Sequence, residues 1–525
     1  MNKTLTVFFF TITTVSLLFA KDFLALVSTN QGLNDATLMQ QHFRVLAQFE
    51  DCWLVQADEP ELIRLQQLGA AVQKFDLPEG KELFYVQTRP GFDRHNLSRY
   101  GTILGTTSAG ILLATDESAL PSLNRLPVEL CRLALEPLTI YPEAPLPPPV
   151  AVSESLVLEL VSRVNPDSVL AHIRRLQDFY TRYSTTESCR AAVEWMRNRL
   201  VAYGCDSTAL ETYRTGYAPN VIGVKTGRLN PNPIYVLCGH IDNTSDYAPQ
   251  HCPGSDDNAS GTAAVLEAAR VFQDIDFAYS VYFIGFTGEE QGLWGSDSFC
   301  RRAARRGDSI RAALNFDMVS YGRQNLDSFE VIGKISSPAC AWLVDSFIAN
   351  ARTYTALKPI RRLVNSAPYS DHHSFWQRGY PALCGIEHDF TPEYHTIGDT
   401  IGPLYFTECG TNNWLMATEA IRAAVATIAK LAGAQPQTGI AQSGTAHLMA
   451  QVSPTIGRPP FYFVVGGEIQ TTAWSIYDPG GRKVARVNSS VWTGKDLQGR
   501  MVAPGVYFCR QEGRTAPAIR LVVCH

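Results

Sequence analysis

The chain has 525 residues, of which 45% are hydrophobic and 18% charged, and its formal net charge is -5. This is the composition of a globular protein long enough for about two to four domains, so it excludes general disorder. The slight acidity also excludes the basic surface that nucleic acids attract, and we expect no nucleic-acid partner.

Residues 1–20 have the features of a signal peptide. Lys3 precedes an apolar stretch, Leu5–Phe19, that is too short for a comfortable membrane span and is followed by Ala20. We expect cleavage near Ala20 and a secreted or cell-surface protein, with an N-terminal membrane anchor as the alternative. No later stretch has the ~20 unbroken apolar residues of a membrane helix.

Residues 21–140 contain an internal duplication. Trp53–Leu68 matches Ile111–Leu126 at a constant offset, and the match pairs Asp58 with Asp116. Each copy has the pattern of a strand, an acidic helix cap and a short amphipathic helix. We therefore predict two small α+β units. Neither copy contains a catalytic cluster, which favours an accessory region or a pro-region.

Two linkers bound a central domain at residues 155–432. Residues 141–154 are rich in proline and predict a stiff spacer, whereas residues 433–447 are small and polar and predict a flexible one. Between them, helical and strand patterns alternate, which is typical of an α/β domain. The strand candidates are Ile234–Gly239, Ser280–Phe286, Ala312–Phe316 and Pro381–Ile386, with helices such as Thr262–Gln273 between them. Their nearly continuous apolar character predicts a mostly parallel sheet covered on both faces.

Twelve cysteines make disulfides possible in an exported chain. Cys189 and Cys205 flank a predicted helix and should lie too far apart to pair. Cys238 and Cys384 fall in apolar strands and are expected to be buried thiols. Cys509 lies near Cys524, and these two could pair.

Acidic and imidazole side chains follow each predicted strand, where open α/β sheets bind their ligands. So many carboxylates in one place would raise one another's pKa values unless cations held them. Histidine and carboxylate ligands without clustered thiolates suit zinc or a similar divalent ion, and there are enough for two ions about 3.5–4 Å apart with one bridging carboxylate. The residues are His240 and Asp242, Asp257 in the turn Gly254–Gly261, Glu289 and Glu290, Asp317, and His395.

Six segments carry a resemblance to a known family. They are "GHID", "PGSDDNASGTAAVLEAAR", "TGEEQGLWGS", "NFDMVSYG", "YSDHHSFWQRGYPA" and "YHTIGDT", in this order. Together they resemble the secreted co-catalytic dizinc aminopeptidases, whose wider family includes glutamate carboxypeptidase-type enzymes and glutaminyl cyclases. The resemblance covers about Ser155 to Ala432.

The resemblance implies two Zn²⁺ ions and a set of residue roles. The implied metal ligands are His240, Asp257, Glu290, Asp317 and His395, with Asp257 bridging the ions. Glu289 is the implied general base, and Tyr394 resembles the tyrosine that donates to the oxyanion in some members. The implied roles of Asn258 and Ser260 are to shape the turn, and Gly261 would start a helix where a side chain would crowd.

The residues themselves indicate a compatible chemistry. Water bridging two cations loses its proton near neutral pH, and Glu289 can accept that proton and pass it to the leaving amine. Asp242, two residues beyond His240, is placed to orient the imidazole through its other nitrogen. We interpret Asp371 and His372 of "SDHH" as wall or supporting groups, because adjacent residues cannot form a nucleophilic triad.

The expected function is that of a zinc-dependent exopeptidase, most simply an aminopeptidase that hydrolyses peptides with a metal-bridged hydroxide. A glutaminyl cyclase on the same scaffold is one alternative. A catalytically retired binding protein is another, although every ligand position and Glu289 are present.

Residues 448–525 consist of short β-runs with Gly/Pro turns such as "DPGG" and "DLQG", which predict a small Ig-like β-sandwich. Trp492, Gly494, Asp496 and Gly499, with Gly505–Phe508, resemble the C-terminal sorting domains of type IX secretion. The outer-membrane secretion machinery is therefore a possible partner, and a purely structural sandwich is the alternative.

Overall fold

The computed structural model falls into two compact units, residues 1–437 and residues 438–525. The predicted signal peptide lies outside the described residues, as does the greater part of the second linker. The structure describes residues 22–29, 44–88, 91–138, 147–322, 328–401, 414–437, 450–453, 456–457, 461–465, 468–469, 473–487, 491–511 and 519–523.

A single eight-stranded sheet organises the first unit, with strand order β16-β15-β17-β14-β11-β13-β10-β9. The central strands β13, β11, β14 and β17 run parallel to one another. β10 and β9 join antiparallel at one edge, and at the other edge β15 pairs antiparallel with β17 and parallel with β16. The prediction of a mostly parallel sheet is confirmed. The strands are β9 (Ser207–Glu211), β10 (Asn220–Lys225), β11 (Asn230–His240), β13 (Tyr279–Phe286), β14 (Ser309–Phe316), β15 (Ser328–Lys334), β16 (Lys358–Val364) and β17 (Ala382–Glu387).

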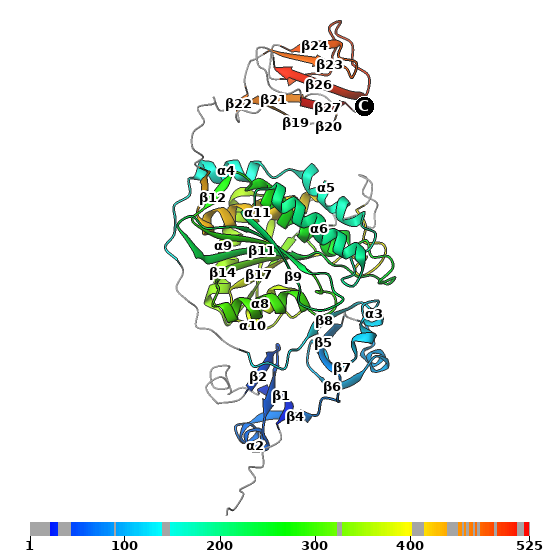
Figure 1. Ribbon diagram of the computed structural model, residues 1–525, viewed down its shortest axis with the longest axis vertical. Coiled ribbons are helices and arrows are strands. Elements are labelled where there is room, and N and C mark those ends of the chain that lie inside the picture. The colour runs from blue at the N-terminus through cyan, green and yellow to red at the C-terminus, as the bar shows by residue number, and fades with distance from the viewer. Residues whose placement is uncertain are drawn as a thin grey trace, which may run out of the picture. The chain divides into compact units, whose positions relative to one another are not determined.

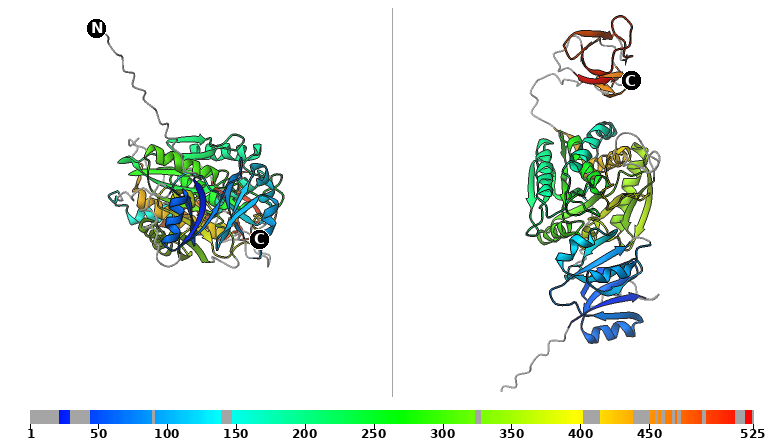
Figure 2. Two further views of the ribbon diagram at one scale, coloured as in Figure 1. Left: turned by 90° about the horizontal axis from the view of Figure 1, so that it is seen from below. Right: turned by 90° about the vertical axis from the view of Figure 1, so that its right-hand side faces the viewer.

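Helices cover both faces of this sheet (Figures 1 and 2). In β11, Tyr235 and Leu237 pack into one buried cluster, whereas Val236 and Cys238 pack into another on the opposite face. Successive side chains of a strand point to opposite faces, so both faces of β11 are buried. The first face carries α4 (Glu154–Ser162), α5 (Pro166–Gln177), α6 (Glu187–Ala202), α7 (Gly261–Val271), α9 (Pro338–Tyr354) and α11 (Trp414–Ala432), and the second α8 (Trp294–Arg306) and α10 (His372–Gln377).

The N-terminal body, which we define as residues 22–138, contains two four-stranded antiparallel sheets. Asp58 caps α2 (Glu59–Gln67) through a reciprocal capping box with Glu61, whereas Asp116 makes no side-chain cap bond to the 3₁₀ turn that follows it. The duplication stays a prediction. The first sheet has the order β2 (Arg44–Gln48), β3 (Cys52–Ala57), β1 (Phe23–Thr29) and β4 (Ala70–Phe75). The second has the order β6 (Thr102–Thr106), β7 (Gly110–Thr115), β5 (Glu82–Thr88) and β8 (Val128–Arg132).

The N-terminal body is joined to the central domain through buried polar and apolar contacts. Asn124 is fully buried; its side-chain amide donates to the Glu290 carbonyl, and its side-chain oxygen accepts from the Tyr183 hydroxyl at 3.0 Å. Leu293 of the central domain packs inside a core cluster of the N-terminal body. Because buried hydrogen bonds and apolar area both hold the two together, they form one unit.

The linker predicted at residues 433–447 begins later than the sequence indicates. Strand β18 (Ala434–Pro436) pairs antiparallel with β12 (Ile275–Phe277), and Ala434 is buried. These small residues continue the central domain because their backbone completes a two-stranded sheet. The sequence prediction was wrong here, since composition alone does not report backbone pairing.

The second unit contains two β-sheets around a core that includes Trp474, Trp492 and Leu521. Asp478–Gly481 forms the turn between β23 (Trp474–Tyr477) and β24 (Lys483–Val487), as predicted. An Ig-like identity and a sorting role stay predictions. One sheet has the order β19-β21-β22, with β25 beside β21, and the other has the order β20-β27-β26-β23-β24. The strands not yet given are β19 (Ala450–Ser453), β20 (Ile456–Gly457), β21 (Phe461–Val465), β22 (Glu468–Ile469), β25 (Val491–Trp492), β26 (Gly505–Gln511) and β27 (Ile519–Val523).

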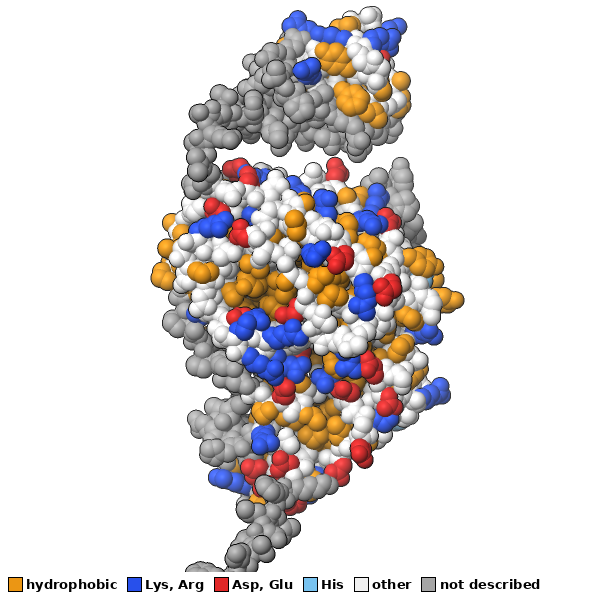
Figure 3. Space-filling model, viewed as in Figure 1, with side chains coloured by type: hydrophobic (Ala, Val, Ile, Leu, Met, Phe, Trp, Pro, Cys, Tyr) orange, Lys and Arg blue, Asp and Glu red, His pale blue; other side chains and the backbone are white. Residues whose placement is uncertain are grey.

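The structure also bears on the cysteines, the surface charge and the possibility of a membrane helix. Cys189 and Cys205 are both free thiols, Cys238 and Cys384 are buried, and Cys524 lies outside the described residues. Basic and acidic side chains stand close together on the face shown in Figure 3. Within the described part of the chain, no helix has the length and apolar character needed to cross a membrane.

Candidate metal centre

The carboxyl ends of the sheet strands bring the predicted ligands together. His240 is the last residue of β11, Asp317 directly follows β14, and Glu290 lies in the turn after β13. His395 comes from the loop after β17, and Asp257 from the turn before α7. All five side chains are buried.

Asp257 lies between two imidazole–carboxylate pairs. Its Oδ1 is 3.3 Å from His240 Nε2, and the same nitrogen is 3.2 Å from Asp317 Oδ1. Its Oδ2 is 3.2 Å from His395 Nε2, which is 3.1 Å from Glu290 Oε2. One carboxylate thus faces two separate sets of donors, which is the arrangement that a bridging ligand requires.

These donors fit metal ions better than they fit one another. His240 forms groups with Glu289 and Asp317, and with Asp257 and Glu290, in which all ligand atoms lie within 4.8 Å of one another. Among the described residues, the buried Glu290 Oε1 has no hydrogen-bond partner. Imidazole nitrogens and carboxylate oxygens without a thiolate are ligands that zinc accepts.

Burial and neighbouring charges shift the pKa values of the carboxylates in this cluster. Burial raises the pKa of Glu290 to about 8, and the nearby Asp257 charge acts in the same direction. Burial likewise raises the pKa of Glu289 well above its usual value, against the influence of His240. Burial would also raise the pKa of Asp257, but hydrogen bonds with His240 and His395 hold it below its usual value. Cations that bind here must therefore displace protons from the cluster.

The turn that carries Asp257 is held by hydrogen bonds on both sides. The backbone N–H groups of Asp256 and Asp257 donate to the two oxygens of Asp399, at 2.9 and 3.0 Å. Asn258 donates to the Phe316 carbonyl at 2.9 Å and accepts from the Gly261 N–H at 2.7 Å. The turn that carries the Asp257 carboxylate is thus fixed to β14 and to the loop of His395.

The predicted crowding at Gly261 is confirmed. A Cβ atom there would lie 2.1 Å from the Phe316 carbonyl oxygen and 2.4 Å from Asn258 Oδ1. Ser260 also shapes the turn as predicted, because its hydroxyl donates to the Asp256 carbonyl at 2.7 Å and accepts from the Val319 N–H. Only glycine lets α7 start this close to β14.

The expected role of Asp242 in orienting His240 stays a prediction. His240 Nδ1 lies 3.1 Å from the Asp242 main-chain oxygen but 3.7 Å from its carboxylate Oδ1. Strand β11 ends at His240, so the alternation that would place both side chains on one face no longer applies. The backbone carbonyl fixes the imidazole, and the carboxylate instead accepts from the Ser184 hydroxyl at 2.8 Å and from the Glu290 N–H at 3.3 Å.

Tyr394 and His395 occupy a constrained segment beside the cluster. Their rings stack with centroids 3.6 Å apart, and His395 has a φ of 54°, in the left-handed region that non-glycine residues rarely adopt. The Tyr394 hydroxyl donates to Glu129 of the N-terminal body. The predicted oxyanion donor is thus held by a residue from outside the central domain.

Several supporting residues were missed by sequence reasoning. Ser370 donates to Asp317 Oδ2 at 2.5 Å, and Asp399 holds the Asp257 turn. Both lie in the segments that carry the family resemblance, so the sequence contained a pattern that could have identified them. Glu129 lies outside those segments, and no sequence pattern marked it as a site residue. Asp371 and His372 are buried and start α10, outside the cavity lining.

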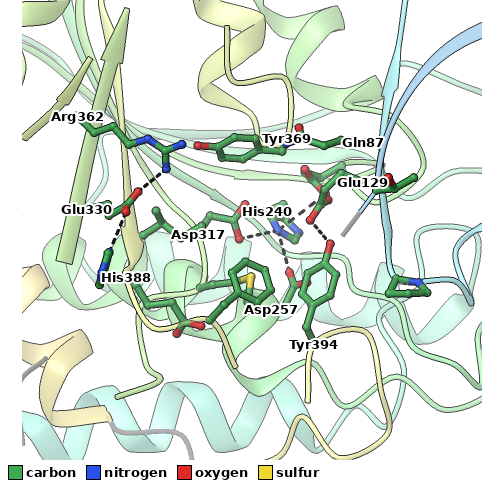
Figure 4. A pocket seen from close by; sticks show the side chains of 17 residues that line it. Gln87, Glu129, His240, Asp257, Asp317, Glu330, Arg362, Tyr369, His388 and Tyr394 are labelled. Atoms are coloured by element: carbon green, nitrogen blue, oxygen red, sulfur yellow. Dashed lines mark hydrogen bonds and ion pairs between the residues drawn. The ribbon is translucent and has the colours of Figure 1, made fainter. Parts of the chain in front are cut away.

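A cavity of about 430 Å³ opens onto the cluster. His240, Asp257, Glu289, Asp317 and Tyr394 line it. Figure 4 shows Tyr394 beside His240 and Asp257. This volume is within the range of small-ligand sites, roughly 300–1,000 Å³. The centre is therefore accessible to a small part of a substrate.

Comparisons with known proteins point to one class. Residues 220–419 match the model of peptidase family M28. A probable zinc metalloprotease of Pyrenophora tritici-repentis is 26% identical over 300 residues, which cover 47% of this chain and 62% of that relative. Leucine aminopeptidase 1 of Grosmannia clavigera is 26% identical over 384 residues, covering 69% of this chain and 87% of the relative.

The fold has solved counterparts. The crystal structure of LapB from Legionella pneumophila is similar with a TM-score of 0.54 at 18% sequence identity, covering 67% of this chain and 99% of LapB. That likeness concerns the fold alone. Residues 220–419 are thus similar to peptidase family M28, and the groups of potential metal ligands lie within the same residues.

We predict that Asp257→Asn abolishes metal binding. The amide cannot supply the second anionic oxygen, so both halves of the centre lose a ligand, and zinc content measured by mass spectrometry should fall by most of its value. The matched control is Glu330→Gln, in the same cavity, because Glu330 is already held by Arg362 and His388. Full zinc retention by Asp257→Asn would contradict the bridging assignment.

Proposed function

We propose that the protein is an exported zinc-dependent aminopeptidase that removes residues from the amino termini of peptides. The observation that carries the proposal is the shared carboxylate of Asp257 between two imidazole–carboxylate pairs, with Glu289 beside them. The names of the relatives, leucine aminopeptidase and zinc metalloprotease, support the same chemistry.

Each half of the proposed centre has its own residues. His240 and Asp317 would hold one zinc ion, His395 and Glu290 the other, and Asp257 both. Zinc bound there supplies Lewis acidity to the scissile carbonyl and lowers the pKa of water so that it attacks near pH 7.

Glu289 is placed to move the proton. Its Oε2 lies 4.0 Å from His240 Nε2, and the residue lines the cavity. The pKa of Glu289 is raised by burial, which favours proton uptake from water and delivery to the leaving amine. The same proton transfer would serve hydrolysis but is also compatible with cyclisation of an N-terminal glutamine.

Assays of the purified full-length chain separate the candidate activities. We expect release of 4-nitroaniline from leucyl-4-nitroanilide, its loss with a zinc chelator, and its recovery with added zinc. Cyclisation of a glutaminyl peptide without anilide hydrolysis would instead establish a glutaminyl cyclase. A zinc-loaded protein with neither activity would establish a binding protein.

Glu289→Gln should retain zinc but lose about 3 kcal/mol or more of transition-state stabilisation, which is a fall of at least about 100-fold in kcat. The amide keeps the shape of the side chain but cannot take up the proton. Stopped assays of anilide hydrolysis at equal zinc content measure the effect. Turnover within a few-fold of the unmodified chain would exclude Glu289 as the base.

Export is the second part of the proposal. It is supported by the sequence of residues 1–20 and by the resemblance of residues 448–525 to type IX sorting domains. We expect the protein outside the inner membrane with a new amino terminus near Lys21, measured by terminal sequencing of the native material. An intact Met1 terminus on the mature protein would contradict export by this signal.

A further inference from the structure

We propose that Glu129, which the N-terminal body contributes to the active-site cavity, binds the protonated α-amine of the substrate's first residue. The inference rests on the proposed aminopeptidase activity. It adds the group that selects amino termini, and it makes the N-terminal body a working part of the site.

Glu129 reaches the cavity because of its place in a sheet. It lies on β8, in register with Gln87 on the neighbouring β5. Gln87, Thr88, Pro127 and Glu129 line the cavity opposite residues of the central domain. Figure 4 shows Glu129 pointing toward Tyr394, to which it is hydrogen-bonded.

The N-terminal body forms a wall of the site and leaves it open. The cavity of about 430 Å³ exists with this body in place, and Asp257 and Glu289 still face it. Asn124 anchors the body to the Glu290 backbone, directly at the metal centre. A segment that merely blocked the site would fill the space in front of these groups.

Charge distinguishes Glu129 from the other acids of the cavity wall. Glu330 is neutralised by Arg362 at 2.7 Å and faces His388 at 2.9 Å. Glu387 accepts backbone N–H groups from Tyr321 and Thr391. Among the described residues, no Lys or Arg forms a salt bridge with Glu129; the Tyr394 hydroxyl donates to it, and the His395 imidazole is the nearby group whose charge acts on it.

A half-buried carboxylate that no Lys or Arg neutralises is stabilised by a ligand that brings a positive charge and a hydrogen-bond donor. The Tyr394 hydroxyl takes one oxygen, Oε1. The second oxygen of Glu129 remains for a donor in the cavity. A substrate ammonium supplies both the hydrogen bond and the opposite charge, and Tyr394 is the neighbour of His395, so the bound amine lies close to the metal centre.

The test compares two metal-binding inhibitors on the zinc-loaded full-length chain. L-Leucine hydroxamate carries the α-amine, and 4-methylpentanohydroxamic acid is the same molecule without it. We expect Glu129→Gln to weaken binding of the first at least about tenfold and to leave the second within about twofold, as isothermal titration calorimetry measures. Glu129→Asp should lose less, because it keeps the charge.

Two further variants make the result specific. Glu330→Gln, in the same cavity but on the central domain, should change neither affinity. Tyr394→Phe removes the hydroxyl and keeps Glu129, so it should largely preserve the preference for the amine. If Glu129→Gln and Tyr394→Phe instead weakened both hydroxamates alike, Glu129 would act only by positioning Tyr394, and the proposal would be overturned.

Other outcomes are equally decisive. Tighter binding of leucine hydroxamate, or faster anilide hydrolysis, by Glu129→Gln would mark an inhibitory contact and overturn the proposal. The hydroxamates need only the metal centre, so the comparison works even if the chain hydrolyses no anilide. The hydroxamate titrations therefore test the role of Glu129, and the anilide assay tests the aminopeptidase activity, so failure of one proposal can be told apart from failure of the other.

Discussion

The site depends on one carboxylate placed between two imidazoles. Asp257 faces His240 with one oxygen and His395 with the other, at 3.3 and 3.2 Å. The surrounding hydrogen bonds, from the Asp257 N–H to the Asp399 carboxylate and from the Asn258 side chain to the Phe316 carbonyl of β14, serve to keep those two oxygens in place. Gly261 allows the turn to sit against the sheet, since any side chain would meet the Phe316 carbonyl.

The rest of the central domain can be understood as support for this arrangement. Parallel strands end at one edge, so residues far apart in the sequence meet there without long loops. Gathering Glu289, Glu290 and Asp317 in a buried place is unfavourable without cations, as the raised pKa of Glu290 shows. The left-handed backbone at Met318 and His395 is a further local cost. Burial of both faces of the sheet supplies the stability that tolerates these features.

Much of this could be predicted from the sequence because the signals are local. Apolar runs identify β11, β13, β14 and β17, and each is followed by its polar residue within a few positions. The contact of the Asp242 main-chain oxygen with His240 Nδ1, at 3.1 Å, was not predicted, because strand β11 ends at His240 and the alternation of side chains ends with it. Strand β18 was missed because its pairing with β12 leaves no mark in composition.

Glu129 could not be found from the sequence. It is an ordinary acidic residue in a β-strand of a region without a catalytic cluster, and its importance arises only from contact with Tyr394, 265 positions away. The packing of the N-terminal body on the central domain creates that contact, and such packing is a property of the whole fold. Tertiary contacts of this kind explain why an accessory region can complete a site whose core is encoded elsewhere.

The most direct measurement is anomalous X-ray diffraction at the zinc edge from crystals of the zinc-loaded protein. The account predicts two peaks, one beside each oxygen of Asp257, with His240 and Asp317 at one and His395 and Glu290 at the other. A single peak, or peaks away from Asp257, would contradict the shared-carboxylate centre.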